Sequence, residues 1–152
     1  MVEMTATVLV MSIMVAVAVP GWSKYQSEMR STSAVMALSS DVQALKRHAM
    51  RTGKSITMTI VVGTSHMTVD PPVPTLIGDT SGVVDYSVRY PGVVFQSAVF
   101  DGSDSAMFTM HGDMVSPSTG QNINNGNATM GTGSGPGVNV NLMNGVNLGV
   151  SL

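Results

Sequence analysis

The first 53 residues restrict the fold more than any other part of the chain. Residues 1–19 contain one charged residue, Glu3, among apolar side chains and small hydroxyls. As an α-helix, which rises 1.5 Å per residue, this run is roughly 30 Å long and so matches the hydrocarbon core of a bilayer. We therefore expect residues 1–19 to form a helix that crosses a membrane or is covered by an equally apolar surface.

The apolar run ends at Pro20 and Gly21. Both residues weaken a helix, because proline lacks a backbone N–H and glycine has a freely variable backbone. We expect the helix to unwind locally at this point when subunits pack together. The residues that follow mix aromatic side chains with cations, as is typical of the interface between a membrane and water, and they are Trp22, Lys24, Tyr25 and Arg30.

Residues 20–53 are predicted to continue the helix in amphipathic form. Apolar residues recur at intervals of three and four and so form one stripe along the helix, at Val35, Leu38, Val42, Leu45 and Ala49. Gly53 has the position of a C-cap, and several cations precede it where the helix dipole favours positive charge. The stripe predicts that this half of the helix packs against a globular domain.

Glu3 needs an explanation, because a carboxylate at membrane depth costs about 2.5–3.5 kcal/mol on insertion scales. An apolar start, Glu3, a proline seventeen residues later and an amphipathic continuation together resemble the N-terminus of type IV pilins and of type II secretion pseudopilins. In that family the glutamate pairs with the N-terminal amine of a neighbouring subunit. The resemblance therefore implies that Met1, Glu3, Pro20 and Gly21 take part in assembly.

The same resemblance implies processing, partners and location. Family precursors carry a short leader that prepilin peptidase removes, and the new N-terminus is methylated. Glu3 lies nearer the first residue than the family's glutamate does, so the position of the mature N-terminus stays open. The expected partners are further copies of the chain, the inner membrane before assembly, and the pilus or secretion machinery. The expected location is the inner membrane, followed by a periplasmic or extracellular filament on the cell surface.

The segment DVQALKRHAMRTGKSITMTI passes from the helix into a strand without a second helix. In this it is similar to the GspH/FimT branch of pseudopilins and minor pilins. The fold class implied is α+β, the pilin fold. A long N-terminal helix over residues 1–53 is followed by a small antiparallel β-sheet head over residues 54–152.

Alternation of β-branched and polar residues predicts the strands of the head, over residues 55–62, 66–70, 83–90, 93–100, 106–111, 138–142 and 146–152. Asn144-Gly145 is typical of a tight hairpin turn between the last two strands. Residues 115–136 are rich in Ser, Thr, Asn and Gly, and we expect them to form one long loop that includes the glycine-rich run 131–135.

Charge is divided unevenly along the chain. Residues 1–54 hold six Lys or Arg against three acidic residues, whereas residues 55–152 hold only Arg89 against six aspartates. A basic N-terminal helix and an acidic head suit subunits in which the helix of one copy stacks on the head of another. The acidic head would repel nucleic acid, so we expect no nucleic-acid partner. The absence of cysteine excludes disulfides and thiolate metal sites.

The sequence predicts neither catalysis nor a cofactor. His48, His66 and His111 lack the spacing of metalloenzyme ligands, and no G-x-S-x-G occurs. Asp101 and Asp104 offer oxygen ligands to calcium, but the spacing of a complete calcium loop is missing, and a solvated turn is the simpler interpretation. We expect no enzyme activity, no cofactor and no metal.

These observations favour a structural subunit that polymerises through its hydrophobic N-terminal helix into a type IV pilus-like or pseudopilus filament. One alternative is a minor pseudopilin that primes or tips a type II secretion filament. Another is a membrane-anchored binding protein. The abundance of the chain in purified surface filaments separates the three, because it would be dominant, trace or absent.

Overall fold

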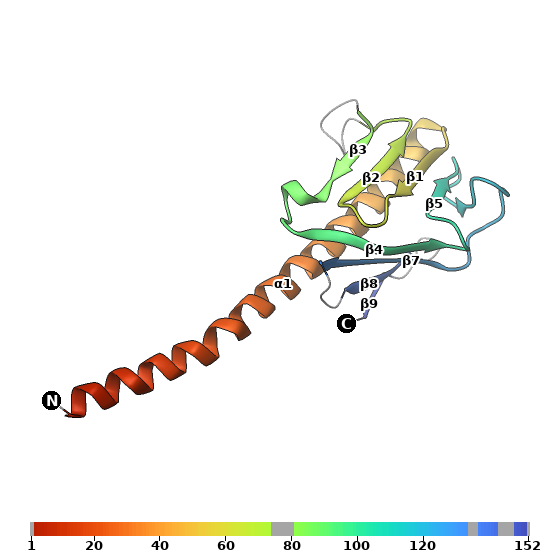
Figure 1. Ribbon diagram of the computed structural model, residues 1–152. Helices are drawn as coiled ribbons and strands as arrows, with labels where there is room; N and C mark the ends of the chain where they lie inside the picture. The colour runs from red at the N-terminus through yellow and green to blue at the C-terminus, as the bar shows by residue number, and fades with distance from the viewer. Residues whose placement is uncertain (1, 74–80, 134–136, 143–147, 152) are drawn as a thin grey trace.

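The computed structural model describes the backbone of residues 2–73, 81–133, 137–142 and 148–151. It describes their side chains too, apart from those of residues 2–7, 15–21 and 148–151. One long helix, α1 (Val2–Thr52), carries a β-rich head on its C-terminal half (Figure 1). Its N-terminal part, residues 2–21, projects away from the head, and we call it the stem. The α+β class with a long N-terminal helix is confirmed.

The backbone of α1 is helical through Pro20 and Gly21. The isolated chain keeps the helix here, because one proline removes one backbone hydrogen bond and the flanking turns keep theirs. The local unwinding that we expect when subunits pack stays a prediction. The predicted C-cap is confirmed. Gly53 adopts a φ of 65° and its N–H donates to the Ala49 carbonyl at 2.9 Å, which ends the helix.

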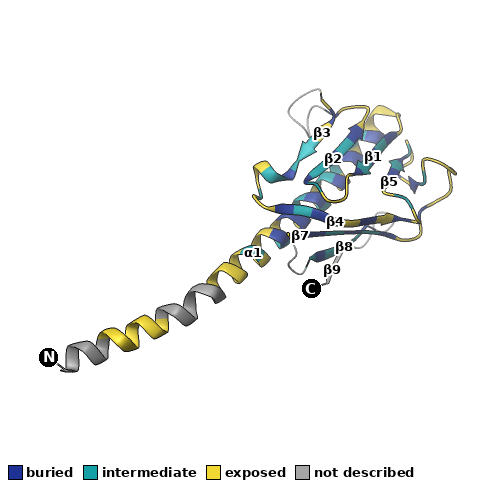
Figure 2. Ribbon diagram, viewed as in Figure 1, coloured by how far each residue is buried: buried dark blue, intermediate teal, exposed yellow. Residues whose placement is uncertain are grey.

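The apolar stripe on the C-terminal half of α1 faces the head, as predicted. Its side chains are at most 7% exposed, and Figure 2 shows burial on α1 only where the helix meets the sheets. The helix packs mainly against β7 (Gly126–Thr132) and β8 (Val138–Leu142). The hydrophobic core therefore lies between α1 and the head, and the stem contributes nothing to it among its described side chains.

The first sheet holds five antiparallel strands in the order β3-β2-β1-β5-β6, namely β1 (Ile56–Ile60), β2 (His66–Asp70), β3 (Val83–Asp85), β5 (Ser105–Phe108) and β6 (Met114–Val115). The first two strands form a hairpin, with Ile60 opposite Met67 next to the turn at Gly63.

The second sheet holds four antiparallel strands in the order β4-β7-β8-β9, and the two strands not yet given are β4 (Val93–Phe100) and β9 (Leu148–Ser151). The pairing of the predicted C-terminal hairpin is confirmed, with Leu142 opposite Leu148. Its Asn144-Gly145 turn lies outside the described residues. The head therefore contains two antiparallel sheets, where the sequence predicted one.

The long loop predicted over residues 115–136 is wrong, because this stretch contains β7, an interior strand of the second sheet. The strand is built from small residues because its neighbours are close. A Cβ added to Gly126 would lie 2.6 Å from the Leu142 carbonyl oxygen, and one added to Gly131 would meet the Gln96 side chain. Tight packing around β7 thus leaves no space for the bulky β-branched residues that usually indicate a strand.

The strand predicted over residues 83–90 is wrong in its second half. β3 ends at Asp85, and a short 3₁₀ helix, η1 (Tyr86–Val88), follows. The Asp85 carboxylate accepts hydrogen bonds from the Ser87 N–H at 2.8 Å and the Ser65 hydroxyl at 2.7 Å. A capped turn therefore replaces the alternating pattern. The strand predicted over 106–111 also ends early, at Phe108, which leaves His111 in a turn.

Candidate functional site

The stem presents apolar side chains to solvent on every side. From Val8 to Met14 all seven residues are exposed, and the apolar ones among them expose between 54% and 68% of their surface. Successive residues of a helix are rotated by about 100°, so seven of them cover its whole circumference. No other described part of the chain covers this surface (Figure 2).

Several hydroxyl side chains on α1, including the one in the described stem, donate to backbone carbonyls of the same helix. The Ser12 hydroxyl donates to the Leu9 carbonyl at 2.8 Å, and further along the Ser27 hydroxyl donates to the Lys24 carbonyl at 2.8 Å. Such bonds within the helix mean that these polar groups need no water. The described stem can therefore enter apolar surroundings without leaving a hydroxyl unpaired.

The predicted assembly residues are distributed along the stem. Glu3 lies at the start of α1 and Pro20 and Gly21 lie farther along it, so the chain itself does not bring Glu3 close to the other two. Their side chains, and the whole of Met1, lie outside the described part of the structure. Within the described residues, no helix is long and apolar enough to cross a membrane.

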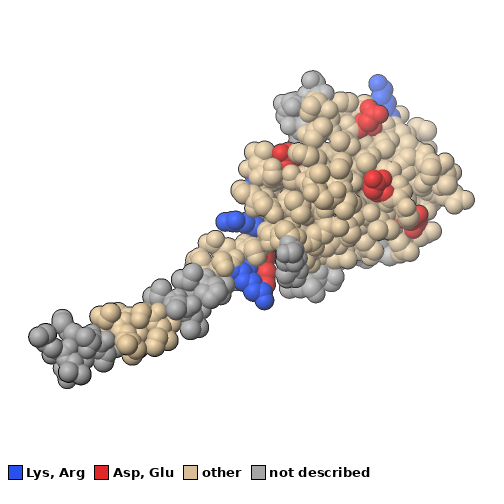
Figure 3. Space-filling model, in the orientation of Figure 1, with Lys and Arg blue, Asp and Glu red and all other residues tan. Residues whose placement is uncertain are grey.

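A short charged segment separates the stem from the head. We call residues 22–30 the neck. Its Trp22 and Tyr25 are 66% and 54% exposed, and Lys24, Glu28 and Arg30 are exposed as well. Figure 3 shows blue and red side chains together where the helix enters the head. None of these three charged side chains forms an ion pair with another described residue.

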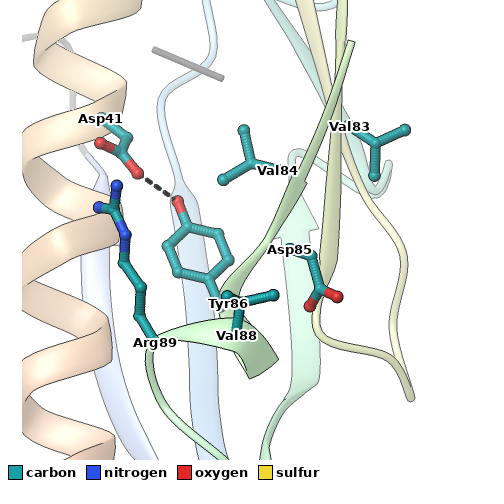
Figure 4. Close-up of a pocket in the computed structure, with 7 residues that line it drawn as sticks. All are labelled: Asp41, Val83, Val84, Asp85, Tyr86, Val88 and Arg89. Atoms are coloured by element: carbon teal, nitrogen blue, oxygen red, sulfur yellow. Dashed lines mark hydrogen bonds between the residues drawn. The ribbon is translucent and has the colours of Figure 1, made fainter. Parts of the chain in front are cut away.

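A cavity of about 260 Å³ lies where α1 meets β3 and η1. We call it the seam pocket, and its lining residues, shown in Figure 4, are Asp41, Val83, Val84, Asp85, Tyr86, Val88 and Arg89. The Tyr86 hydroxyl donates to Asp41 Oδ2 at 2.8 Å. The Arg89 side chain extends beside the Tyr86 ring toward the Asp41 carboxylate (Figure 4).

Burial governs protonation at this contact. Desolvation raises the pKa of the Asp41 carboxyl, while the hydrogen bond from Tyr86 and the positive charge of Arg89 act in the opposite direction. Burial and the neighbouring Asp41 charge raise the pKa of the Tyr86 phenol well above its ordinary value. The phenol therefore stays protonated at neutral pH and remains the donor.

A second polar cluster lies on the head beside the seam pocket. The hydrogen bond from Ser65, followed by those from Ser87, lowers the pKa of the Asp85 carboxyl. His66 Nδ1 lies 3.7 Å from Asp85 Oδ1 and has no hydrogen-bond partner among the described residues. This cluster fixes the end of β3, and its serine hydroxyl is bonded to the carboxylate, not to the imidazole. It therefore lacks the order of groups that a nucleophilic serine needs.

The candidate calcium ligands form a turn. The Asp101 carboxylate accepts the backbone N–H groups of Asn124 and Asn125 at 2.8 and 3.1 Å, which uses both of its oxygens. Among the described residues there is no group of three or more His, Asp or Glu placed to hold a metal ion. His48 lies in α1, His66 in β2 and His111 in a turn, so the fold also distributes the three histidines among separate elements.

Searches of protein-family models, of curated proteins and of solved structures found no match to this chain.

The seam pocket was not predicted from the sequence. Its one signal is Asp41, an acidic residue directly before the buried Val42 in the apolar stripe. The partners of this residue are Tyr86 and Arg89, more than forty positions away in a segment predicted as strand. Sequence periodicity shows which face of a helix is buried, but it does not show which distant side chain meets an acid at the edge of that face.

Proposed function

We propose that the chain is a structural subunit that polymerises through its N-terminal helix into an extracellular filament of the type IV pilus or secretion pseudopilus class. The observation that carries this proposal is the apolar surface from Val8 to Met14, which faces solvent around the whole circumference of the stem. The resemblance of the N-terminal segment to pilins supports the same conclusion.

The arrangement of the exposed residues decides what has to cover them. A single partner helix buries one stripe and would leave the opposite side of the stem in water. Lipid, or several neighbouring stems, covers all sides. Burying the six apolar side chains between Val8 and Met14 contributes on the order of 10 kcal/mol, at about 1.5–3 kcal/mol each. A bundle of identical stems therefore replaces the bilayer when the subunit leaves the membrane.

Glu3 has a defined role in this proposal. Its carboxylate enters an apolar environment, where an unpaired charge is costly. The N-terminal ammonium of a neighbouring copy is the cation that the stem supplies at the same end. The pairing selects a subunit in register and removes the cost of the buried charge.

The proposal predicts that Glu3→Ala abolishes or severely reduces filament formation and leaves membrane insertion intact. The measurement is electron microscopy of filaments sheared from cells, together with the amount of the chain in the membrane fraction. Gln121→Ala, which changes an exposed residue of the head without changing charge, is the matched control and should assemble normally.

Three outcomes separate the functions considered. A structural subunit dominates the sheared filaments, a minor pseudopilin is present there in trace amounts, and a membrane-anchored binding protein is absent from them. Normal filaments from the Glu3→Ala variant would contradict the proposed assembly mechanism.

A further inference from the structure

The seam pocket presents two opposite charges at its mouth. Arg89 is the only basic residue after Lys54, and its exposed side chain extends toward Asp41 (Figure 4). Within the described part of the chain, Arg89 forms no ion pair. Asp85, the other acid of the pocket, is already held by Ser65 and Ser87. The pocket thus offers an incoming partner the Arg89 guanidinium and the Asp41 carboxylate, of which one oxygen already accepts from Tyr86.

The pocket also carries exposed apolar surface. Val88 is 79% exposed and Val83 is 37% exposed, and both line the cavity beside Arg89. Apolar side chains next to paired charges are the composition of a protein contact. A partner surface that carries one acidic and one basic side chain beside an aromatic or apolar side chain would complement this pocket.

The neck has this composition. Lys24 and Glu28 are four residues apart, so they lie on one face of α1. Both are exposed, neither is ion-paired among the described residues, and Tyr25, three residues before Glu28, is 54% exposed on an adjacent position. Glu28 is the only acidic residue of the neck, and Arg89 is the only Lys or Arg after Lys54.

We propose that the seam pocket of one copy is the docking site for the neck of another copy. In this contact Glu28 of one chain pairs with Arg89 of the next, Lys24 approaches Asp41, and Tyr25 covers Val88. The inference rests on the proposed filament function and specifies the lateral contact that sets the register between subunits.

The contact joins two different surfaces of the same chain. Such heterologous contacts do not close into a two-fold dimer and propagate into rings or filaments. Seventeen residues separate Lys24 from Asp41, the residue that it approaches in the next copy, which corresponds to roughly 25 Å of helix. Two copies joined in this way are therefore displaced along their stems by about that distance.

Charge reversal tests the pairing in the full chain. Arg89→Glu and Glu28→Arg are each expected to reduce sheared filaments about tenfold, since close interfacial charge pairs couple at least this strongly. The double variant, which exchanges the two charges, should recover assembly toward the wild-type level. Lys54→Glu is the matched control, because it reverses the charge of an exposed residue outside the proposed contact, and it should assemble normally.

Disulfide crosslinking tests the same contact without changing charge. The chain has no cysteine, so Tyr25→Cys and Val88→Cys can be expressed together in one strain as two separate chains. Oxidation should yield a dimer that contains one chain of each kind. Neither variant expressed alone should form this dimer, because each presents only one side of a heterologous contact.

The outcomes distinguish this inference from the proposed function. If both charge-reversal variants form filaments at the wild-type level and no mixed crosslink appears, the docking site is overturned. The proposed filament function then still stands. A mixed crosslink supports the docking site even if a charge variant fails to accumulate. Filaments that depend on Arg89 but not on Glu28, with no crosslink, would place another ligand in the pocket and contradict the neck as its occupant.

Discussion

Asp41 and Tyr86 show how one polar contact fixes the C-terminal half of α1 against the head. The Tyr86 hydroxyl reaches across 45 positions of sequence to the Asp41 carboxylate, and its ring packs edge-on against Phe95 with centroids 5.7 Å apart. The hydrogen bond satisfies a carboxyl that the fold partly removes from water. Loss of either partner would leave the other poorly solvated.

Tyr86→Phe should therefore lower the free energy of unfolding by about 1–3 kcal/mol at neutral pH. Burial raises the pKa of Asp41, so its contribution to stability is complete below the pKa of the unfolded chain and is lost as the pH rises through the folded value. Without the phenol donor this pKa rises further. The loss in the variant should thus be larger at pH 7 than near pH 3.

The measurement is chemical denaturation of the full chain in detergent at the two pH values. Tyr25→Phe removes a hydroxyl from an exposed tyrosine and is the matched control, with an expected change below about 0.5 kcal/mol. A destabilisation of equal size at both pH values would show that Tyr86 acts through packing alone.

At the scale of elements, α1 was predictable and β7 was not. The stripe at Val35, Leu38 and Leu45 has the period of a helix, and the burial of that face depends on the stripe alone. The identity of β7 depends on residues distant in sequence, because its glycines fit against Leu142 and Gln96. Local composition therefore indicated a loop where the packing requires a strand.

The same reasoning explains the boundary at Asp85. Alternation from Val83 to Tyr90 is a local pattern, whereas the turn depends on the Asp85 carboxylate meeting Ser65, which directly precedes β2. In the candidate site, the apolar character of the stem was predicted from hydropathy. The seam pocket was not, because it is assembled from α1 and a segment far along the chain.

Gly126→Ala tests whether β7 tolerates a side chain. The added Cβ would lie 2.6 Å from the Leu142 carbonyl oxygen, so the paired strands have to separate. We expect a loss of about 1–3 kcal/mol in the free energy of unfolding, as for other overpacked sites. Asn127→Ala, at the next and only half-buried position, is the control and should change stability much less. An unchanged midpoint for Gly126→Ala in denaturant would contradict the strand pairing.

At the scale of the whole molecule, two parts of the chain differ in how much of their apolar surface is buried. The head and the C-terminal half of α1 bury a shared core, whereas the described apolar side chains of the stem are all exposed. The basic residues concentrate on α1 and the acidic residues on the head. Copies of such a molecule can satisfy both parts at once if stems bundle with stems and necks meet heads.

The most direct test is maleimide labelling of Val10→Cys, since the natural chain has no cysteine. Val10 is 54% exposed in the isolated chain and lies in the middle of the apolar surface of the stem. The account predicts that this cysteine is protected in sheared filaments and reacts fully after the filaments are dissociated in denaturant. Rapid labelling in intact filaments, or protection found only in a membrane fraction that yields no filaments, would contradict it.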